Sequence, residues 1–360
     1  MITSIKNNQK IFSNTCRVYI CNYFYNNKKA DSLLKWSDNV LNELKEYVEE
    51  IYIPNLEIDT DEHSLPYFKL FNKRYNQIVK YEVFMFFGNV NTLNKEILLL
   101  YNKFVFLKKD VKLTDKYITC FWGIMEGTSI IRSVNLELIN RFFDEFWVGS
   151  QFVKDNLDKY DIKSIVVPNG INHNIFKPNQ SLLNNQICKI LCVATDVPRK
   201  NLDLLVNCFI KLNHICLILK TNTNRFQNIQ SNIITLDCDI PDDKMAELIN
   251  QCHFAINVSI SEGFGLPLCE AIACGKRIIA PYYGGIKTFA NPDNIIPIPH
   301  EINDLSSQFH DFFGQGAVFK EDDIIQSIMK AYEMYQKHSV QSVMLNPVFY
   351  WKNIVNSLII

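Results

Sequence analysis

The chain has 360 residues, which is more than one hydrophobic core usually serves, so two domains are the natural expectation. Its 37 basic residues nearly balance its 38 acidic ones, and neither kind forms a tail or a block. Nucleic-acid binding depends on a concentrated positive field, so this composition argues against a nucleic-acid partner.

The eleven cysteines indicate a reducing compartment. They include no C-x-x-C pair, and several lie inside apolar runs such as 187–195, where a thiol behaves as a small buried hydrophobe. Cys252 and His253 have no second ligand pair at a suitable spacing, so we expect no metal site. The N-terminus lacks the apolar core of a signal peptide, and no window reaches about 18 apolar residues. We therefore expect a cytoplasmic protein without a transmembrane segment, for which a peripheral membrane contact stays open.

The first part of the chain alternates strand-like and helix-like patterns, which predicts a compact α/β domain over residues 1–145. Residues 31–50 carry an apolar face at helical spacing. No glycine-rich turn follows the first strand, so nothing here is typical of a phosphate-binding loop. The strands are expected at 17–25, 49–57, 81–90, 102–108 and 116–123.

The second part has a clearer pattern, and we expect it to begin after Asp144 as a domain over residues 146–345. Amphipathic stretches at 201–212 and 242–250 predict helices, the second capped by Asp242 or Asp243. Continuous apolar strands alternating with helices predict a parallel sheet covered on both faces. These strands are expected at 164–170, 189–195, 214–220, 232–238, 253–259, 276–281 and 294–299.

The most informative segment is 259–275, SISEGFGLPLCEAIACG. Glycines at 263 and 265 make a flexible turn after an apolar strand, and Pro267 suits the first turn of a helix. Gly275 suits the position just after that helix. The pattern therefore predicts a helix whose N-terminus, with free N–H groups and a favourable dipole, attracts a phosphate.

Two carboxylates frame this turn, Glu262 before it and Glu270 one turn into the helix. At a strand-to-helix junction, both side chains are able to point toward one ligand and accept hydrogen bonds from sugar or ribose hydroxyls. The alternative is that Glu262 is an ordinary solvated residue and that Glu270 only favours the start of the helix.

Arg199 and Lys200 occupy another junction between a strand and a helix, where open α/β sheets bind their ligands. They are therefore candidates to contact an anion, although such a pair is usually an ordinary surface feature. Asn169 and Gly170 form a turn after a third strand and are candidates to border the same cleft. His173 nearby is better explained by packing or hydrogen bonding within its loop.

Together these segments resemble the retaining glycosyltransferases of family 4, which have the GT-B architecture of two facing Rossmann-like domains. The resemblance covers about residues 117–355. It is carried by FWVGSQFVKDNL (146–157), VVPNGINHNIF (166–176), VPRKN (197–201), PDDKMAELINQCHFAINVS (241–259), the E-x7-E signature EGFGLPLCEAIACG (262–275) and FYWKNIV (349–355). The last of these is similar to the closing helix that returns to the first domain, here within 346–360.

The resemblance implies transfer of a sugar from a nucleotide-diphosphate sugar to a hydroxyl acceptor, with retention and without a cofactor or a metal. Glu262 would contact the donor sugar, and Glu270 the ribose. Lys200 would neutralise the diphosphate, helped by Arg199. The backbone N–H groups of the turn at Gly263, Phe264, Gly265 and Leu266 would assist. The acceptor would be a glycan or another hydroxyl compound.

The sequence departs from the family at two positions of the second domain, and its first domain lacks the family's usual glycine-rich turn and its catalytic-side His. Ala194 stands where the family usually places an Arg, and Thr288 stands where it usually places a Glu. A catalytically silent nucleotide-sugar-binding protein is therefore the alternative, and a phosphorylase of the same architecture is a more remote one.

On the acceptor side, the segment CFWGIMEGTSI (120–130) is similar to a tryptophan–glutamate segment of some family members. Glu126 has Gly123 and Gly127 beside it, and these would let a ligand approach the backbone. We expect Glu126 to orient or deprotonate the acceptor hydroxyl. The alternative is an ordinary turn glutamate.

Overall fold

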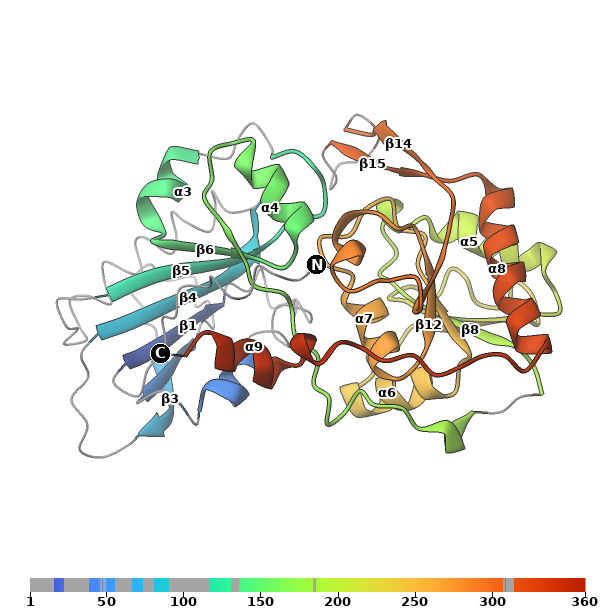
Figure 1. Ribbon diagram of the computed structural model, residues 1–360, viewed down its shortest axis with the longest axis horizontal. Coiled ribbons are helices and arrows are strands. Elements are labelled where there is room, and N and C mark those ends of the chain that lie inside the picture. The colour runs from blue at the N-terminus through green and yellow to red at the C-terminus, as the bar shows by residue number, and fades with distance from the viewer. Residues whose placement is uncertain are drawn as a thin grey trace. The chain divides into compact units, whose positions relative to one another are not determined.

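The computed structural model of the chain forms two compact units (Figure 1). It describes residues 16–22, 39–45, 47, 50–55, 67–73, 81–90, 117–130, 136–183, 186–306, 308 and 314–359. The first unit contains the chain up to Met125, Ile130–Gly170 and Val348–Ile360. The second contains Glu126–Ser129 and Ile171–Pro347.

The first unit is built on a sheet in the order β3-β2-β1-β4-β5-β6-β7. Its neighbouring strands are parallel, except that β3 runs antiparallel to β2. The strands are β1 (Cys16–Asn22), β2 (Glu50–Asn55), β3 (Tyr67–Lys73), β4 (Tyr81–Asn89), β5 (Tyr117–Ile124), β6 (Glu145–Val148) and β7 (Ile165–Val166).

Both faces of this sheet are covered, as the unbroken apolar run of β4 requires. Successive side chains of a strand point to opposite faces. Accordingly, Val83 and Met85 pack on one face with α9 (Trp351–Ser357), while Phe84 and Phe86 pack on the other with α3 (Leu136–Phe142) and α4 (Gln151–Asp158). Figure 1 shows α9, near the red end of the chain, beside the blue β1.

The expected domain boundary at residues 145/146 needs correction. Strand β6 pairs with β5, and β7 pairs with β6, so residues 146–170 extend the first sheet. The chain enters the second unit after Gly170. Alternating strands and helices look the same on either side of this junction, so the local pattern does not show which sheet a strand joins.

Three further expectations for the first unit have different outcomes. The predicted helix at 31–50 is helical at 39–44, but it cannot extend to Glu50, which begins β2. Strand β3 was not predicted, because its sequence YFKLFNK mixes polar and apolar residues. The strand expected at 102–108 lies outside the described residues.

The second unit contains a parallel sheet in the order β10-β9-β8-β11-β12-β13. By chain order this is 3-2-1-4-5-6, the Rossmann topology. The strands are β8 (Lys189–Val193), β9 (Cys216–Lys220), β10 (Ile233–Leu236), β11 (Phe254–Ile256), β12 (Arg277–Ala280) and β13 (Ile295–Pro297). The predicted strands of this unit are thus confirmed.

The main helices of the second unit are α5 (Leu202–Lys211), α6 (Asp242–Asn250), α7 (Leu266–Ala273) and α8 (Glu321–Gln336). The helix predicted at 242–250 is confirmed, but neither Asp242 nor Asp243 caps it: Pro241 is the N-cap, and both carboxylates lie in the first turn. The unit also has an antiparallel pair, β14 (Glu301–Asp304) with β15 (Gln315–Val318).

Three observations on the described residues bear on the composition. The ten cysteines with described side chains are free thiols, and all except Cys238 are buried. Within the same residues, no three His, Cys, Asp or Glu side chains are grouped as a metal site would require. Finally, none of the helices described is both long and apolar enough to cross a bilayer.

Candidate functional site

The candidate site lies where the strand order of the second sheet reverses. Strands β8 and β11 are neighbours, but the chain continues from them toward opposite edges of the sheet. The loops that follow them, 194–201 and 257–265, leave side by side from the carboxyl edge. Open α/β sheets bind ligands at such a switch point.

The backbones of these two loops are hydrogen-bonded to each other. The N–H of Ile260 donates to the carbonyl of Arg199 at 3.0 Å. The side-chain amide of Asn201 donates to the carbonyl of Val258 at 3.3 Å. Asn201 has a left-handed backbone, with φ of 52°, which turns the chain from the short helix Pro198–Lys200 into α5. The side chains of Arg199 and Lys200 are therefore held against the loop that carries Glu262.

Glu262 is the centre of a buried ion-pair network. The Nζ atom of Lys200 lies 2.5 Å from its Oε1 atom, and the side-chain amide of Asn257 donates to that same oxygen at 3.0 Å. An Nη atom of Arg199 lies 4.0 Å from its other oxygen. Only 7% of the Glu262 side chain and 11% of the Lys200 side chain are exposed, so water screens this pair little.

The network keeps Glu262 ionised. Burial by itself raises the pKa of the Glu262 carboxyl, but the positive charges of Lys200 and Arg199 outweigh burial and hold that pKa well below its usual value. At neutral pH this carboxylate only accepts hydrogen bonds, which suits sugar hydroxyls. By contrast, burial raises the pKa of the Cys192 thiol at the end of β8 to about 12, so that thiol stays protonated.

Glu126 joins the same network through Arg199. An Nη atom of Arg199 donates to Oε2 of Glu126 at 3.1 Å, and both side chains are largely buried. The short segment Glu126–Ser129 belongs to the second unit, where Thr128 accepts a hydrogen bond from the N–H of Gln315 at 2.7 Å. Four of the predicted site residues, Glu126, Arg199, Lys200 and Glu262, therefore lie together.

The glycine pair 284–285 packs against the Glu262 loop. The N–H of Gly285 donates to the carbonyl of Glu262 at 2.7 Å. A Cβ atom on Gly285 would lie 2.1 Å from the carbonyl oxygen of Gly263, and one on Gly284 would lie 2.9 Å from that of Glu262. Only glycine allows the two backbones to approach this closely.

Helix α7 starts at this loop as the sequence predicts. Gly265 is its N-cap with φ of 92°, Pro267 lies in its first turn and Gly275, with φ of 81°, follows its end. Pro267 has no N–H, and the N–H groups of Leu268 and Cys269 donate to the carbonyl of Gly265 at 3.1 and 3.3 Å. The helix dipole is therefore what favours an anion at this end. Phe264 is buried against Phe289, with ring centroids 5.3 Å apart, and this contact fixes the turn before the helix.

Glu270 lies one turn into α7 and is half-buried. Asn169 and Gly170 belong to the first unit, and their predicted donor contact stays a prediction. A Cβ atom on Gly170 would lie 2.3 Å from the ring of Trp351, so packing against α9 already explains this glycine.

Sequence reasoning missed two residues of the site. Asn257 follows β11 and binds Glu262, while its own Oδ1 atom accepts from the N–H of Ser259 at 2.7 Å. In the sequence, Asn257 is a single amide residue at the end of an apolar strand. Polar side chains at this position lie at the carboxyl edge of the sheet, where ligands bind.

The second missed residue is Arg225, which binds two carboxylates that flank Lys200 in the sequence. Its guanidinium donates to both carboxylate oxygens of Asp196, at 2.5 and 2.8 Å, and to both of Asp203, at 2.5 and 2.9 Å. It also lies 3.9 Å from the ring centre of Phe226. Since Asp196 precedes the short helix and Asp203 opens α5, this paired contact sets the path of residues 196–203.

Comparisons with known proteins show what the chain is similar to. Residues 174–313 match the family model of glycosyl transferases group 1. Over 156 residues the chain is 26% identical to MMP alpha-(1->4)-mannosyltransferase of Mycolicibacterium hassiacum, covering 39% of this chain and 38% of that protein. Over 151 residues it is 28% identical to an uncharacterized glycosyltransferase of Methanocaldococcus jannaschii, covering 40% and 41%. The chain thus spans about two fifths of the length of the curated relatives it matches.

Solved structures share the fold at low sequence identity. Sucrose-phosphate synthase of Thermosynechococcus elongatus superposes with a TM-score of 0.62 at 14% identity, covering 96% of this chain and 97% of that one. The Anabaena protein HepE, solved with UDP-glucose, has a TM-score of 0.57 at 12% identity, with coverage of 95% and 93%. Two Rossmann-like units of this kind define a GT-B protein. Within the second unit, residues 174–313 are similar to the glycosyl transferases group 1, whose family model they match.

Proposed function

We propose that this protein is a glycosyltransferase that moves a sugar from a nucleotide-diphosphate sugar to a hydroxyl acceptor, with retention of anomeric configuration. The observation that carries the proposal is the buried network of Lys200, Arg199 and Glu262 beside the N-terminus of α7. It combines cations, a helix dipole and an ionised carboxylate at the switch point of a Rossmann sheet, inside the segment that matches the family.

Lys200 is the proposed partner of the donor diphosphate. As the bond to the sugar breaks, negative charge grows on the nucleotide, and a fixed cation in a buried site stabilises that charge. The N–H groups of the turn 263–266 add to this stabilisation. We propose that Lys200 and this helix start together supply the positive potential that a metal ion supplies in other transferases.

The two carboxylates have separate proposed roles. Glu262, ionised and held by Lys200 and Asn257, accepts hydrogen bonds from the hydroxyls of the donor sugar. Glu270, half-buried in α7, accepts from the ribose hydroxyls. Binding the diphosphate draws Lys200 away from Glu262 in part, and this frees acceptor positions on the carboxylate when the sugar arrives.

Arg199 and Glu126 form the proposed link to the acceptor. We propose that Arg199 takes the role of the family Arg that Ala194 replaces; its guanidinium donates to Glu126 at 3.1 Å. We propose that Glu126 holds Arg199 toward the diphosphate and uses its second carboxylate oxygen to orient the acceptor hydroxyl.

The relatives suggest which donors to try first. HepE was solved with UDP-glucose, and starch synthase IV of Arabidopsis thaliana, of the same fold, with ADP and acarbose. One relative is a mannosyltransferase, so mannose is a second donor sugar to test. The first panel therefore combines UDP and ADP with glucose and mannose, and GDP-sugars extend it.

The test has two readouts on this panel. A donor that binds the folded protein raises its melting temperature, and a transferase also hydrolyses its donor slowly without an acceptor. We expect one nucleotide sugar to do both, and the Glu262→Gln variant to retain nucleotide binding while losing hydrolysis. Stabilisation by a donor without release of nucleotide would instead establish the silent binding protein.

Two additions test the finer claims. Hydrolysis that persists in excess EDTA agrees with a metal-independent site, whereas its loss, restored by Mg²⁺, contradicts that claim. Retention is read from the anomeric configuration of the first product by NMR.

A further inference from the structure

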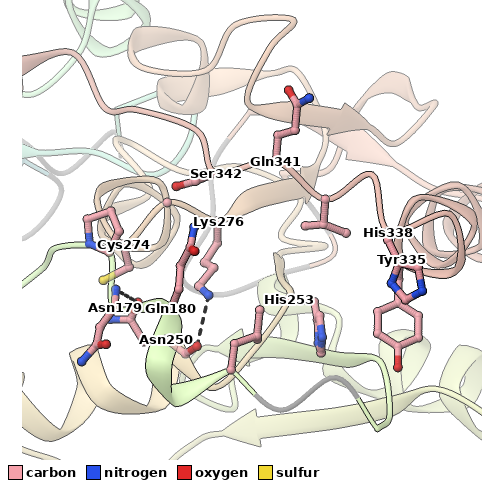
Figure 2. Close-up of a pocket in the computed structure, with 14 residues that line it drawn as sticks. Asn179, Gln180, Asn250, His253, Cys274, Lys276, Tyr335, His338, Gln341 and Ser342 are labelled. Atoms are coloured by element: carbon pink, nitrogen blue, oxygen red, sulfur yellow. Dashed lines mark hydrogen bonds between the residues drawn. The ribbon is translucent and has the colours of Figure 1, made fainter.

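A cavity lies in the same unit, at the edge of the sheet opposite the candidate site. It occupies about 270 Å³ where β11 and β12 begin, and where α6, α7 and α8 end. Figure 2 shows its lining, with Lys276 near Asn250 and with His253, Tyr335 and His338 along one side. This volume is large enough for several water molecules, or for one molecule the size of a hexose phosphate.

Lys276 is the charged group of this cavity, and it is 8% exposed. Its backbone N–H donates to the carbonyl of Ala271 at 2.9 Å, closing the end of α7 after the left-handed Gly275. Its ammonium donates one hydrogen bond, to the carbonyl of Asn250 at 3.1 Å. An ammonium has three donors, so two remain for a ligand.

Among the described residues, no carboxylate lines the cavity, whereas the ammonium of Lys276 and the imidazole rings of His253 and His338 do. Burial lowers the pKa of Lys276, and the nearby thiols Cys252 and Cys274 offset that effect only in part. A buried ammonium is costly without a counter-charge. An anion in the cavity would supply the counter-charge that the described lining residues do not provide.

The wall around Lys276 is held by a polar framework. The Oδ1 atom of Asn250 accepts from the N–H of Asn179 at 2.8 Å, and its amide donates to the carbonyls of Lys177 and Ala246. Nδ1 of His253 accepts from the N–H of Lys189 at 3.1 Å, which leaves the ring proton on Nε2. The site is therefore preorganised.

Neutral donors complete the lining. The side chains of Asn179, Gln180, Gln341 and Ser342 add amide and hydroxyl groups at the exposed side of the cavity. Amide and hydroxyl groups are able to hydrogen-bond both the oxygens of a phosphate and the hydroxyl groups of the small polar molecule that carries it. The cavity thus combines one buried cation with a neutral hydrogen-bonding rim.

We propose that this cavity binds a small phosphate monoester, whose phosphate pairs with Lys276. This site is separate from the proposed donor site, which lies at the carboxyl edge of the same sheet. The competing explanation is that Lys276 serves only the C-terminus of α6, where a cation is favoured by the helix dipole. The two explanations differ in what happens when phosphate is added.

Calorimetric titration with inorganic phosphate, and then with glucose 6-phosphate and glucose, tests the proposal. We expect phosphate to bind with a Kd of about 1 mM or tighter. Glucose 6-phosphate should bind more tightly than phosphate, and glucose should not bind. The Lys276→Met variant should weaken phosphate binding by about tenfold or more, because a charge-assisted hydrogen bond is lost.

A second variant protects the test against a Lys276→Met protein that fails to fold. Gln180→Glu is nearly isosteric and places a carboxylate in the lining of the cavity, where it should replace the anion and abolish phosphate binding. The matched control is Gln336→Glu, which adds the same charge at an exposed residue beside the cavity but outside its lining. This control should bind phosphate within about twofold of the wild type.

The proposal is overturned if wild-type protein takes up no phosphate, or if folded Gln180→Glu protein binds it as tightly as Gln336→Glu. Phosphate binding that disappears in Lys200→Met but not in Gln180→Glu would place the anion at the donor site alone. None of these readouts depends on sugar transfer, so the outcome is independent of the proposed function.

Discussion

Lys200 Nζ lies 2.5 Å from Glu262 Oε1, so the cation and the carboxylate of the candidate site neutralise each other before any ligand arrives. The pair joins two loops that leave the sheet from neighbouring strands, β8 and β11. A buried pair of this kind has a structural role as well as a chemical one, and substitutions must separate the two.

Lys200→Met should reduce turnover by about 10²-fold or more, because a fixed cation next to the developing charge is lost. It should also lower the free energy of unfolding by about 3–5 kcal/mol, since Glu262 stays buried without its partner. The double variant Lys200→Met with Glu262→Gln should recover most of the stability but none of the turnover. Chemical denaturation and donor hydrolysis together check this. If the double variant is no more stable than Lys200→Met, the unpaired Glu262 carboxylate is not the cause of the lost stability.

Glu126→Gln separates two roles for Glu126. Sugar transfer should fall while acceptor-free donor hydrolysis and donor affinity stay near wild type, if the carboxylate mainly orients the acceptor. Arg199→Met should weaken donor binding and hydrolysis, because it removes a cation 4.0 Å from Glu262. If both variants lose donor affinity equally, Glu126 acts only by holding Arg199. Wild-type transfer in Glu126→Gln would show that Glu126 does not orient the acceptor.

Glu270→Ala should weaken binding of the nucleoside diphosphate by about 1.5–3 kcal/mol, the typical cost of losing a hydrogen bond to a charged group. Calorimetry measures this directly. The control is Glu247→Ala on the neighbouring helix α6, where the carboxylate pairs with Lys244 at the surface. Unchanged affinity in Glu270→Ala would remove the ribose assignment.

Gly285→Ala should disturb the Glu262 loop without changing any charge. The added Cβ would meet the backbone of Gly263 at 2.1 Å, so the loop must move. We expect a lower melting temperature and weaker donor binding. Lys287→Ala, at an exposed residue of the same short helix, should behave as wild type. An alanine at 285 that leaves both the melting temperature and donor binding unchanged would show that the close approach is not required.

His253 makes stability depend on pH. Burial first, and then the positive charges of Lys276 and Lys189, lowers the pKa of His253 to about 4, whereas the unfolded chain titrates at about 6.5. Between these values the unfolded state binds more protons, so stability is complete above pH about 6.5 and falls as the pH drops toward 4. The full loss is on the order of 3 kcal/mol.

His253→Gln should flatten this part of the pH profile, as measured by urea denaturation. Glu262 adds a separate loss at lower pH, because its pKa is lowered in the folded state and its contribution disappears as it becomes protonated. If the stability of the His253→Gln variant still declines in the same way between pH 6.5 and 4, other groups cause the pH dependence.

The local pattern of residues determined much of the second unit. Each strand from β8 to β13 coincides with an apolar run, and α7 begins and ends at the predicted proline and glycine. These features depend on side chains within a few residues of one another: the period of the apolar positions, the fixed φ of proline and the left-handed backbone open to glycine. Sequence alone therefore placed the candidate loops at the ends of β8 and β11.

Only the tertiary structure decided how these pieces join. Residues 146–170 extend the first sheet because β6 pairs with β5, a choice that a strand's own sequence does not encode. Asn257 and Lys200 meet at Glu262, and Arg199 reaches Glu126 across 73 positions of the chain. Such contacts arise when the packing of distant elements fixes where charged side chains are buried. Burial is what turns individually ordinary residues into one coupled network, since an ion pair away from water is screened little and must be satisfied by its neighbours.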